Sequence, residues 1–174
     1  MKKLQLLTLI ILFTINAFGQ NDCKFVINEK QIRENKNLDV FLDKMKNEKF
    51  VVNNNKNSIP KQVRKELDCI AKEFSIANPK ENYQKGCEAG INVPKRQLIF
   101  LAKSEDVLIL SYASGGITSS THFLFINYDS KSIIDLWTGV GMGIIKHKSL
   151  KEITNFISKQ RNKKLGLNTN IVSI

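Results

Sequence analysis

The stretch LIFLAKSEDVLILSYASGGITSSTHFLFINYDSKSIIDLW, residues 98–137, decides the fold class of this chain. It contains four apolar runs rich in β-branched and aromatic residues, over 98–102, 107–112, 121–127 and 132–137. Short polar turns separate the first two runs and the last two, and the longer connection 114–120 separates the middle pair. Because such turns join neighbouring antiparallel strands, this spacing predicts a four-stranded meander.

Helical patterns flank the meander on both sides. Apolar residues recur at helical spacing over 37–47 and from Pro60 to Phe74. A further helix is expected from Ser149, because Ser149 and Glu152 have the spacing of a capping box. Segments 23–28 and 49–53 are candidate short strands. We therefore predict an α+β fold, a single antiparallel sheet extended by short N-terminal strands and packed against two or three helices.

The first 19 residues have the three parts of a secretory signal peptide. Lys2 and Lys3 precede an apolar run over 4–15, and Ala17 and Gly19 are small residues at the expected cleavage site. The run is shorter than the ~20 residues that a membrane-spanning helix needs. We expect cleavage after Gly19, export to the periplasm or the extracellular space, and no transmembrane segment afterwards. Residues 20–174 then form one domain.

The mature chain is strongly basic. Of the 27 basic residues in the sequence, cleavage removes two, which leaves 25 against 16 acidic residues and a formal charge of +9. Such a surplus attracts polyanions, so the expected partner is a protein or a polyanionic envelope component. Nucleic acid is not expected, because no recognition motif for it occurs and the protein is exported.

The chain contains three cysteines, Cys23, Cys69 and Cys87. An oxidising compartment predicts one disulfide and one remaining thiol, with three possible pairings. We favour Cys69–Cys87, because Cys69 falls off the apolar stripe of its helix and Cys87 lies in a long loop that needs tethering. No cysteine pair has metal-ligand spacing, so neither a metal site nor a cofactor is predicted.

The segment YASGGITSSTH, residues 112–122, is the candidate catalytic region. Ser119 or Ser120 lies close to His122, and residues two apart share a face of a strand, so a serine–histidine pair is possible there. Asp129 or Asp135 would complete a triad. The segment lacks the Gly-x-Ser-x-Gly elbow of serine hydrolases, and turn chemistry alone explains its composition. A hairpin loop is therefore the favoured interpretation.

Two groups of residues are candidate binding determinants. Gly115, Gly116 and Thr118 lie in the connection that could project from the sheet, and a second, basic group precedes the last helix. That group consists of Lys146, His147 and Lys148. An anion could bind there, although a solvated turn with a neutral histidine explains the residues as well. The glycine-rich residues 139–143 lack a nucleotide-binding spacing and are expected to form a flexible or bulged exit from the last strand.

These observations favour an exported, non-enzymatic binding protein, for instance an inhibitor or immunity-type protein that acts on an envelope partner. Two alternatives remain open. The first is a small serine hydrolase that uses the 114–122 region. The second is a peripheral protein that binds anionic lipid or another polyanion through the basic last helix.

Overall fold

The computed structural model describes residues 23–86, 93–116, 118–161 and 172–174. Its centre is one six-stranded sheet in the order β1-β3-β4-β5-β6, with β2 beside β3. The strands are β1 Val51–Val52, β2 Ile76–Ala77, β3 Arg96–Lys103, β4 Val107–Ser114, β5 Ser120–Tyr128 and β6 Ile133–Met142. Every pairing is antiparallel except that of β2 with β3. The predicted four-stranded meander, β3 to β6, and the α+β class are confirmed.

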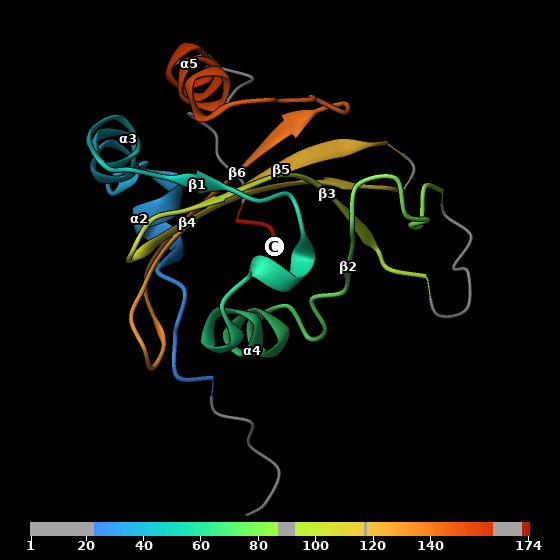
Figure 1. Ribbon diagram of the computed structural model, residues 1–174, viewed down its shortest axis with the longest axis horizontal. Coiled ribbons are helices and arrows are strands. Elements are labelled where there is room, and N and C mark those ends of the chain that lie inside the picture. Colours follow the sequence, from blue (N-terminus) through green and yellow to red (C-terminus); the bar gives the residue numbers. More distant parts are fainter. Residues whose placement is uncertain (1–22, 87–92, 117, 162–171) are drawn as a thin grey trace, which may run out of the picture.

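Helices cover both faces of this sheet. They are α2 Glu29–Arg33, α3 Leu38–Asn47, the 3₁₀ turn η2 Lys56–Ser58, α4 Lys61–Ile70 and α5 Leu150–Gln160. Figure 1 shows α3 and α5 on one side of the sheet and α4 on the other. The molecule thus has three layers. The sheet is the middle layer, and its central strands are buried between α3 and α5 on one side and α4 on the other (Figure 1).

The side-chain contacts agree with this layering. Phe125 of β5 packs against Phe41 of α3, with ring centroids 6.1 Å apart, and Phe123 packs against Phe156 of α5 at 5.6 Å. Tyr112, on the opposite face, meets Phe74 edge-on at 5.7 Å. Because both faces are covered, the strands form continuous apolar runs instead of an alternating pattern.

The local predictions succeed in part. Helix α3 and strand β1 lie where the pattern places them, whereas residues 23–28 form no strand and are followed by the unpredicted helix α2. Helix α4 ends at Ile70, earlier than predicted, because Lys72 and Glu73 adopt positive φ angles of 47° and 97°. Phe74 therefore reaches the core from a turn.

The glycine-rich segment 139–143 was predicted to be a flexible or bulged exit from the last strand, and this is wrong for residues 139–142, which pair regularly with β5. Strand β6 continues to Met142, so Gly139 and Gly141 are strand residues. A Cβ on Gly141 would lie 2.8 Å from Ile145 Cδ1 and 3.4 Å from the Phe156 ring. The side chains of Ile145 and Phe156 thus pack directly over this glycine, and an added Cβ would have to displace the end of the Ile145 side chain.

The predicted disulfide Cys69–Cys87 is also wrong, because Cys69 pairs with Cys23, with 5.7 Å between their Cα atoms. The N-terminal segment runs along α4, where the backbone N–H of Phe25 donates to the Glu66 carboxylate at 3.1 Å. This contact brings Cys23 to the end of the helix, a long-range proximity that spacing along the sequence does not reveal. Cys87 lies outside the described residues.

Candidate functional site

A cleft of about 400 Å³ opens beside the ends of β3 and β4, on the face of the sheet that carries α3 and α5. One wall is the loop 79–85, which follows β2, and the opposite wall is the segment 144–146, which leads from β6 to α5. The floor comes from β3 and β4. Lysines stand on both walls, and we call this feature the lysine cleft.

The floor of the lysine cleft is largely apolar. Ala113 is buried, Ile99 and the polar Gln97 are half-buried, and Ile144 on the second wall is 40% exposed. A β-bulge in β3 between Leu98 and Phe100 places Ile99 outside the regular alternation of the strand. The cleft therefore offers apolar surface beneath a polar rim.

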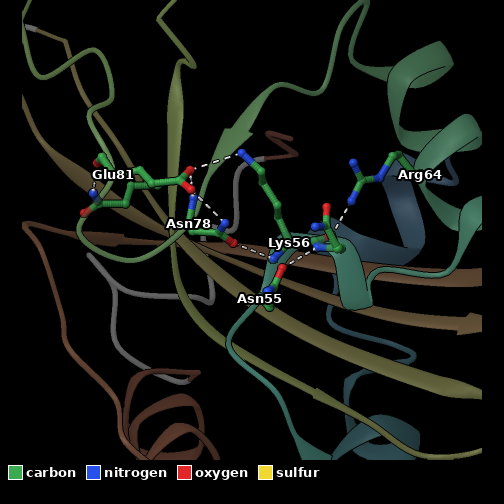
Figure 2. Close-up of polar contacts among 7 residues, drawn as sticks. Asn55, Lys56, Arg64, Asn78 and Glu81 are labelled. Carbon is green, nitrogen blue, oxygen red and sulfur yellow. Dashed lines mark hydrogen bonds and ion pairs between the residues drawn. The ribbon is translucent and has the colours of Figure 1, made fainter.

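Glu81 holds the first wall in place, as Figure 2 shows. Its carboxylate accepts hydrogen bonds from the backbone N–H of Asn78 at 2.7 Å and from the Asn78 side-chain amide at 2.9 Å. Lys56 Nζ lies 3.1 Å from the same carboxylate. The bonds from Asn78, followed by Lys56, lower the pKa of Glu81 to about 2. The Glu81 charge is thus engaged by Lys56 and Asn78.

The same network joins the wall to its neighbours. The backbone N–H of Lys56 donates to Asn78 Oδ1 at 2.8 Å, and the Arg64 guanidinium of α4 donates to the Lys56 carbonyl (Figure 2). From β3, Gln97 Nε2 donates to the Glu81 carbonyl at 2.6 Å. The 3₁₀ turn η2 and strand β3 therefore hold the loop that forms the wall, and α4 supports it through its contact with η2.

The connection between β4 and β5 supports the wall from its far end. A Cβ on Gly115 would lie 2.0 Å from the Gln84 carbonyl oxygen and 2.8 Å from Lys85 Cα. Gly116, with φ of +146°, donates its N–H to the Lys85 carbonyl at 3.5 Å. The missing Cβ of Gly115 lets two backbones touch, and Gly116 supplies the positive φ, so their part in the site is to position the loop.

In the part of the chain that the structure describes, the rim carries three exposed lysines, Lys80 and Lys85 on one wall and Lys146 on the other. Among the described residues none of the three forms an ion pair, whereas Lys56 and Lys44 do. Lys85 lies over the Tyr83 ring, with Nζ 5.9 Å from the centroid. The cleft thus has an uncompensated positive rim, which favours a negatively charged ligand.

The structure separates the predicted binding residues. Lys146 lines the cleft and Gly115 and Gly116 support its wall, whereas Thr118 is exposed and Lys148 is exposed next to α5. Of all these residues, only Lys146 could contact a ligand in the cleft.

His147 does not lie on the rim, because it is buried between two rings. The Phe123 centroid is 5.5 Å away and the Phe156 centroid 5.3 Å away. Burial lowers its pKa, and the nearby Glu152 opposes that effect. The direction agrees with the neutral histidine expected from the neighbouring charges, but the cause of the lowered pKa is burial.

The side chains of the predicted serine–histidine pair, Ser120 and His122, lie within hydrogen-bond distance of each other. Ser120 Oγ lies 2.9 Å from His122 Nε2, and the imidazole stacks on Tyr112 with centroids 5.0 Å apart and an angle of 10°. His122 is only 8% exposed, and burial lowers its pKa against the opposing effect of the Ser173 backbone. The pair lies on the face that carries α4, opposite the lysine cleft.

Neither candidate carboxylate reaches this pair. Asp129 binds the backbone N–H groups of Lys131 and Ser132 in the turn after β5, at the other end of the strand from His122. Asp135 pairs across the sheet with Asn127 and accepts hydrogen bonds from Gln31 and Asn37. Within the described part of the chain no carboxylate binds His122, so the triad is not assembled.

A second hollow, of about 580 Å³, lies beside Glu48, Lys49, Ser104, Glu105 and Asp106. Lys44 pairs with two of its carboxylates, Asp106 at 2.6 Å and Glu48 at 3.5 Å. Its charges are therefore largely balanced within the protein, and none of the described residues that line it is apolar. We consider it a weaker candidate than the lysine cleft.

The described residues contain no group of three or more histidine, cysteine, aspartate or glutamate side chains that could hold a metal ion. They also contain no helix with the length and apolar character that crossing a membrane requires. In α5, Ile153 and Ile157 are buried against the sheet, so these apolar side chains are not available to a lipid surface.

Sequence reasoning missed most of the lysine cleft. Lys80, Lys85, Gln97, Ile99 and Ile144 were not predicted as site residues. The available signal was the long connection 76–95, because long loops inside compact domains are often functional. Its partner across the cleft could not be read from the sequence.

Comparisons of the chain with protein-family models, with curated proteins and with solved structures find no match.

Proposed function

We propose that this chain is an exported, non-enzymatic binding protein that holds an anionic group of its partner in the lysine cleft. One observation carries the proposal. Lys80, Lys85 and Lys146 stand on two facing walls, without ion-pair partners among the described residues, above an apolar floor. Unpaired charges of one sign around a cleft raise the local concentration of the opposite charge and speed its association.

The rigidity of the wall supports a binding role. The Glu81 network and the contact at Gly115 hold the loop before any ligand arrives. A site that is already ordered loses less conformational entropy on association than a flexible loop does. The cleft is therefore preorganised for a ligand.

Export is supported by two independent features. The sequence begins with the charged, apolar and small-residue pattern of a signal peptide, and Cys23 pairs with Cys69. Disulfides persist mainly in oxidising compartments. A partner in the periplasm or outside the cell, either an envelope protein that is inhibited by binding or another polyanionic component, fits this location.

A polyanion column tests the proposal with two variants of equal net charge. The cleft variant replaces Lys80, Lys85 and Lys146 by alanine, and the control variant replaces three exposed lysines outside the cleft, Lys49, Lys103 and Lys159. Substitutions at such exposed sites change stability by only about 0.5 kcal/mol. We expect the cleft variant to elute from immobilised heparin at clearly lower salt than the control. Equal elution of the two variants would mean that only net charge matters and would overturn the proposal.

A serine hydrolase is the second candidate, favoured by the 2.9 Å contact between Ser120 Oγ and His122 Nε2. A serine-reactive fluorophosphonate probe distinguishes it from a pure binding protein. Labelling of the wild-type protein that disappears in Ser120→Ala would establish a reactive serine. A folded wild-type protein that stays unlabelled would end this alternative.

A further inference from the structure

The rim of the lysine cleft has a chemical preference among anions. Its cations are all lysines, and none of the described lining residues is an arginine. Arginine presents a planar fork that matches carboxylates and phosphates alike, whereas lysine is a compact charge with three rotatable donors that binds phosphate as a point charge. Because Lys146 faces Lys80 and Lys85 across the cleft, a group with oxygens in several directions can contact both walls.

The floor adds a second requirement. Ile99 and Ala113 line it, and Ile144 leaves 40% of its surface exposed at its edge. An inorganic anion would meet the rim and leave this apolar surface in water. A ligand with an apolar body would cover it. The volume, about 400 Å³, falls within the range of about 300–1,000 Å³ that is typical of sites for small organic ligands.

We infer that the group bound in the lysine cleft is a phosphate or sulfate ester carried on an apolar body. The inference rests on the proposed function and specifies the ligand of the same site. The oxyanion contacts Lys146 on one wall and Lys80 or Lys85 on the other, and the apolar body covers Ile99 and Ile144. A soluble aryl or alkyl ester and the headgroup of an anionic lipid share this chemistry.

Calorimetric titration of the full mature chain with four small probes tests the inference. The probes are 1-naphthyl phosphate, inorganic phosphate, 1-naphthol and 1-naphthoate. We expect 1-naphthyl phosphate to bind about tenfold more tightly than inorganic phosphate, since about 60 Å² of apolar surface leaves water with it. Equal affinities for these two probes would overturn the apolar requirement. An affinity for 1-naphthoate equal to that for 1-naphthyl phosphate would overturn the preference for the ester.

Pairs of matched variants test whether the probes bind in the lysine cleft. Ile144→Ser should abolish most of the tenfold advantage of 1-naphthyl phosphate, whereas Ile134→Ser, which changes an isoleucine that is 56% exposed and does not line the cleft, should preserve it. Lys146→Ala should weaken all anionic probes by about twofold to fivefold, and Lys159→Ala should not. Identical behaviour within either pair would place the binding elsewhere and refute the inference.

Two lipid probes separate the sources of the ester. Binding of 1-naphthyl phosphate together with vesicles of phosphatidylcholine and phosphatidic acid indicates a lipid headgroup, and binding of the soluble ester alone indicates a soluble ligand. Either result upholds the inference, and binding of neither overturns it. If the cleft variant and the control variant elute from heparin at different salt concentrations while 1-naphthyl phosphate binds no more tightly than inorganic phosphate, only the inferred ligand class is wrong. If the heparin experiment fails, the binding function itself is wrong.

Discussion

The closest approach of two backbones at the site gives a sharp prediction for Gly115→Ala. A Cβ at this position would lie 2.0 Å from the Gln84 carbonyl oxygen, 2.8 Å from Lys85 Cα and 2.9 Å from the Gln84 carbonyl carbon. Real Cβ contacts are essentially never shorter than 3.0 Å, so the loop must move away by at least about 1 Å. All three obstructing atoms belong to the backbone, so a change of side-chain rotamer cannot relieve the clash.

The displacement has two measurable consequences. Overpacking of this kind costs about 1–3 kcal/mol, which should appear as a lower free energy of unfolding in urea titration. Because the displaced residues include Lys85, the affinity for 1-naphthyl phosphate should fall by about twofold to fivefold, as much as when one lysine contact is lost.

Gly86→Ala is the matched control. A Cβ on Gly86 meets nothing within 4 Å, and this glycine directly follows the loop 79–85. We expect Gly86→Ala to change neither the free energy of unfolding nor the affinity appreciably. If Gly115→Ala and Gly86→Ala behave alike in both assays, the contact at Gly115 does not hold the wall and the reasoning is refuted.

Three further predictions concern the rest of the fold and the wall. Burial lowers the pKa of His122 and His147 in the folded protein, so the unfolded chain takes up protons first as the pH falls below 6.5. The free energy of unfolding should therefore decrease from about pH 7.5 to about pH 5.5, by at most about 1.4 kcal/mol per pH unit for each histidine, and a flat profile in urea titrations would contradict this. Replacing Cys23 and Cys69 by serine opens a loop with a sequence separation of 46 and should cost about 4 kcal/mol in the same assay, while an unchanged stability would show that the disulfide contributes nothing. Asn78→Ala leaves the net charge unchanged but removes its side-chain hydrogen bonds to Glu81 and Lys56, so calorimetry should show weaker binding of 1-naphthyl phosphate by about twofold or more. Wild-type affinity in that variant would show that the network does not position the wall.

The sequence predicts the parts of this fold that depend on local pattern. The four long strands follow from apolar runs and polar turns, and α3 follows from its helical periodicity. The cap of α5 is also local, since Ser149 accepts the Glu152 N–H at 3.2 Å. In the predicted capping box Glu152 would bind the backbone of Ser149, but it accepts the N–H of Lys148 at 2.9 Å.

The features that were missed depend on contacts between distant segments. Cys23 reaches Cys69 only because the N-terminal segment runs along α4, as the bond from Phe25 to Glu66 shows. Strand β2 contains two residues and forms because they pair with β3. No local sequence pattern predicts this pairing. The sequence predicts a flexible or bulged chain at Gly141, yet this glycine is a strand residue covered by the side chains of Ile145 and Phe156.

In the candidate site, too, the sequence predicts local contacts and misses contacts between distant segments. The contact between Ser120 and His122 was predictable because two residues on one strand share a face. The lysine cleft was not, because its walls are 79–85 and 144–146 and its floor belongs to strands between them in sequence. Lys146 was identified as a basic residue before a helix, but its partners across the cleft emerge only when the chain is folded.

Nuclear magnetic resonance titration of the ¹⁵N-labelled mature chain with inorganic triphosphate tests the central claim most directly. The claim that the lysine cleft binds anions predicts that the largest amide shifts fall in 79–85, 97–99, Ala113 and 144–146, and that they disappear in the variant lacking Lys80, Lys85 and Lys146. Shifts spread evenly over the basic surface, or centred on α5 or on the Ser120–His122 pair, would contradict it.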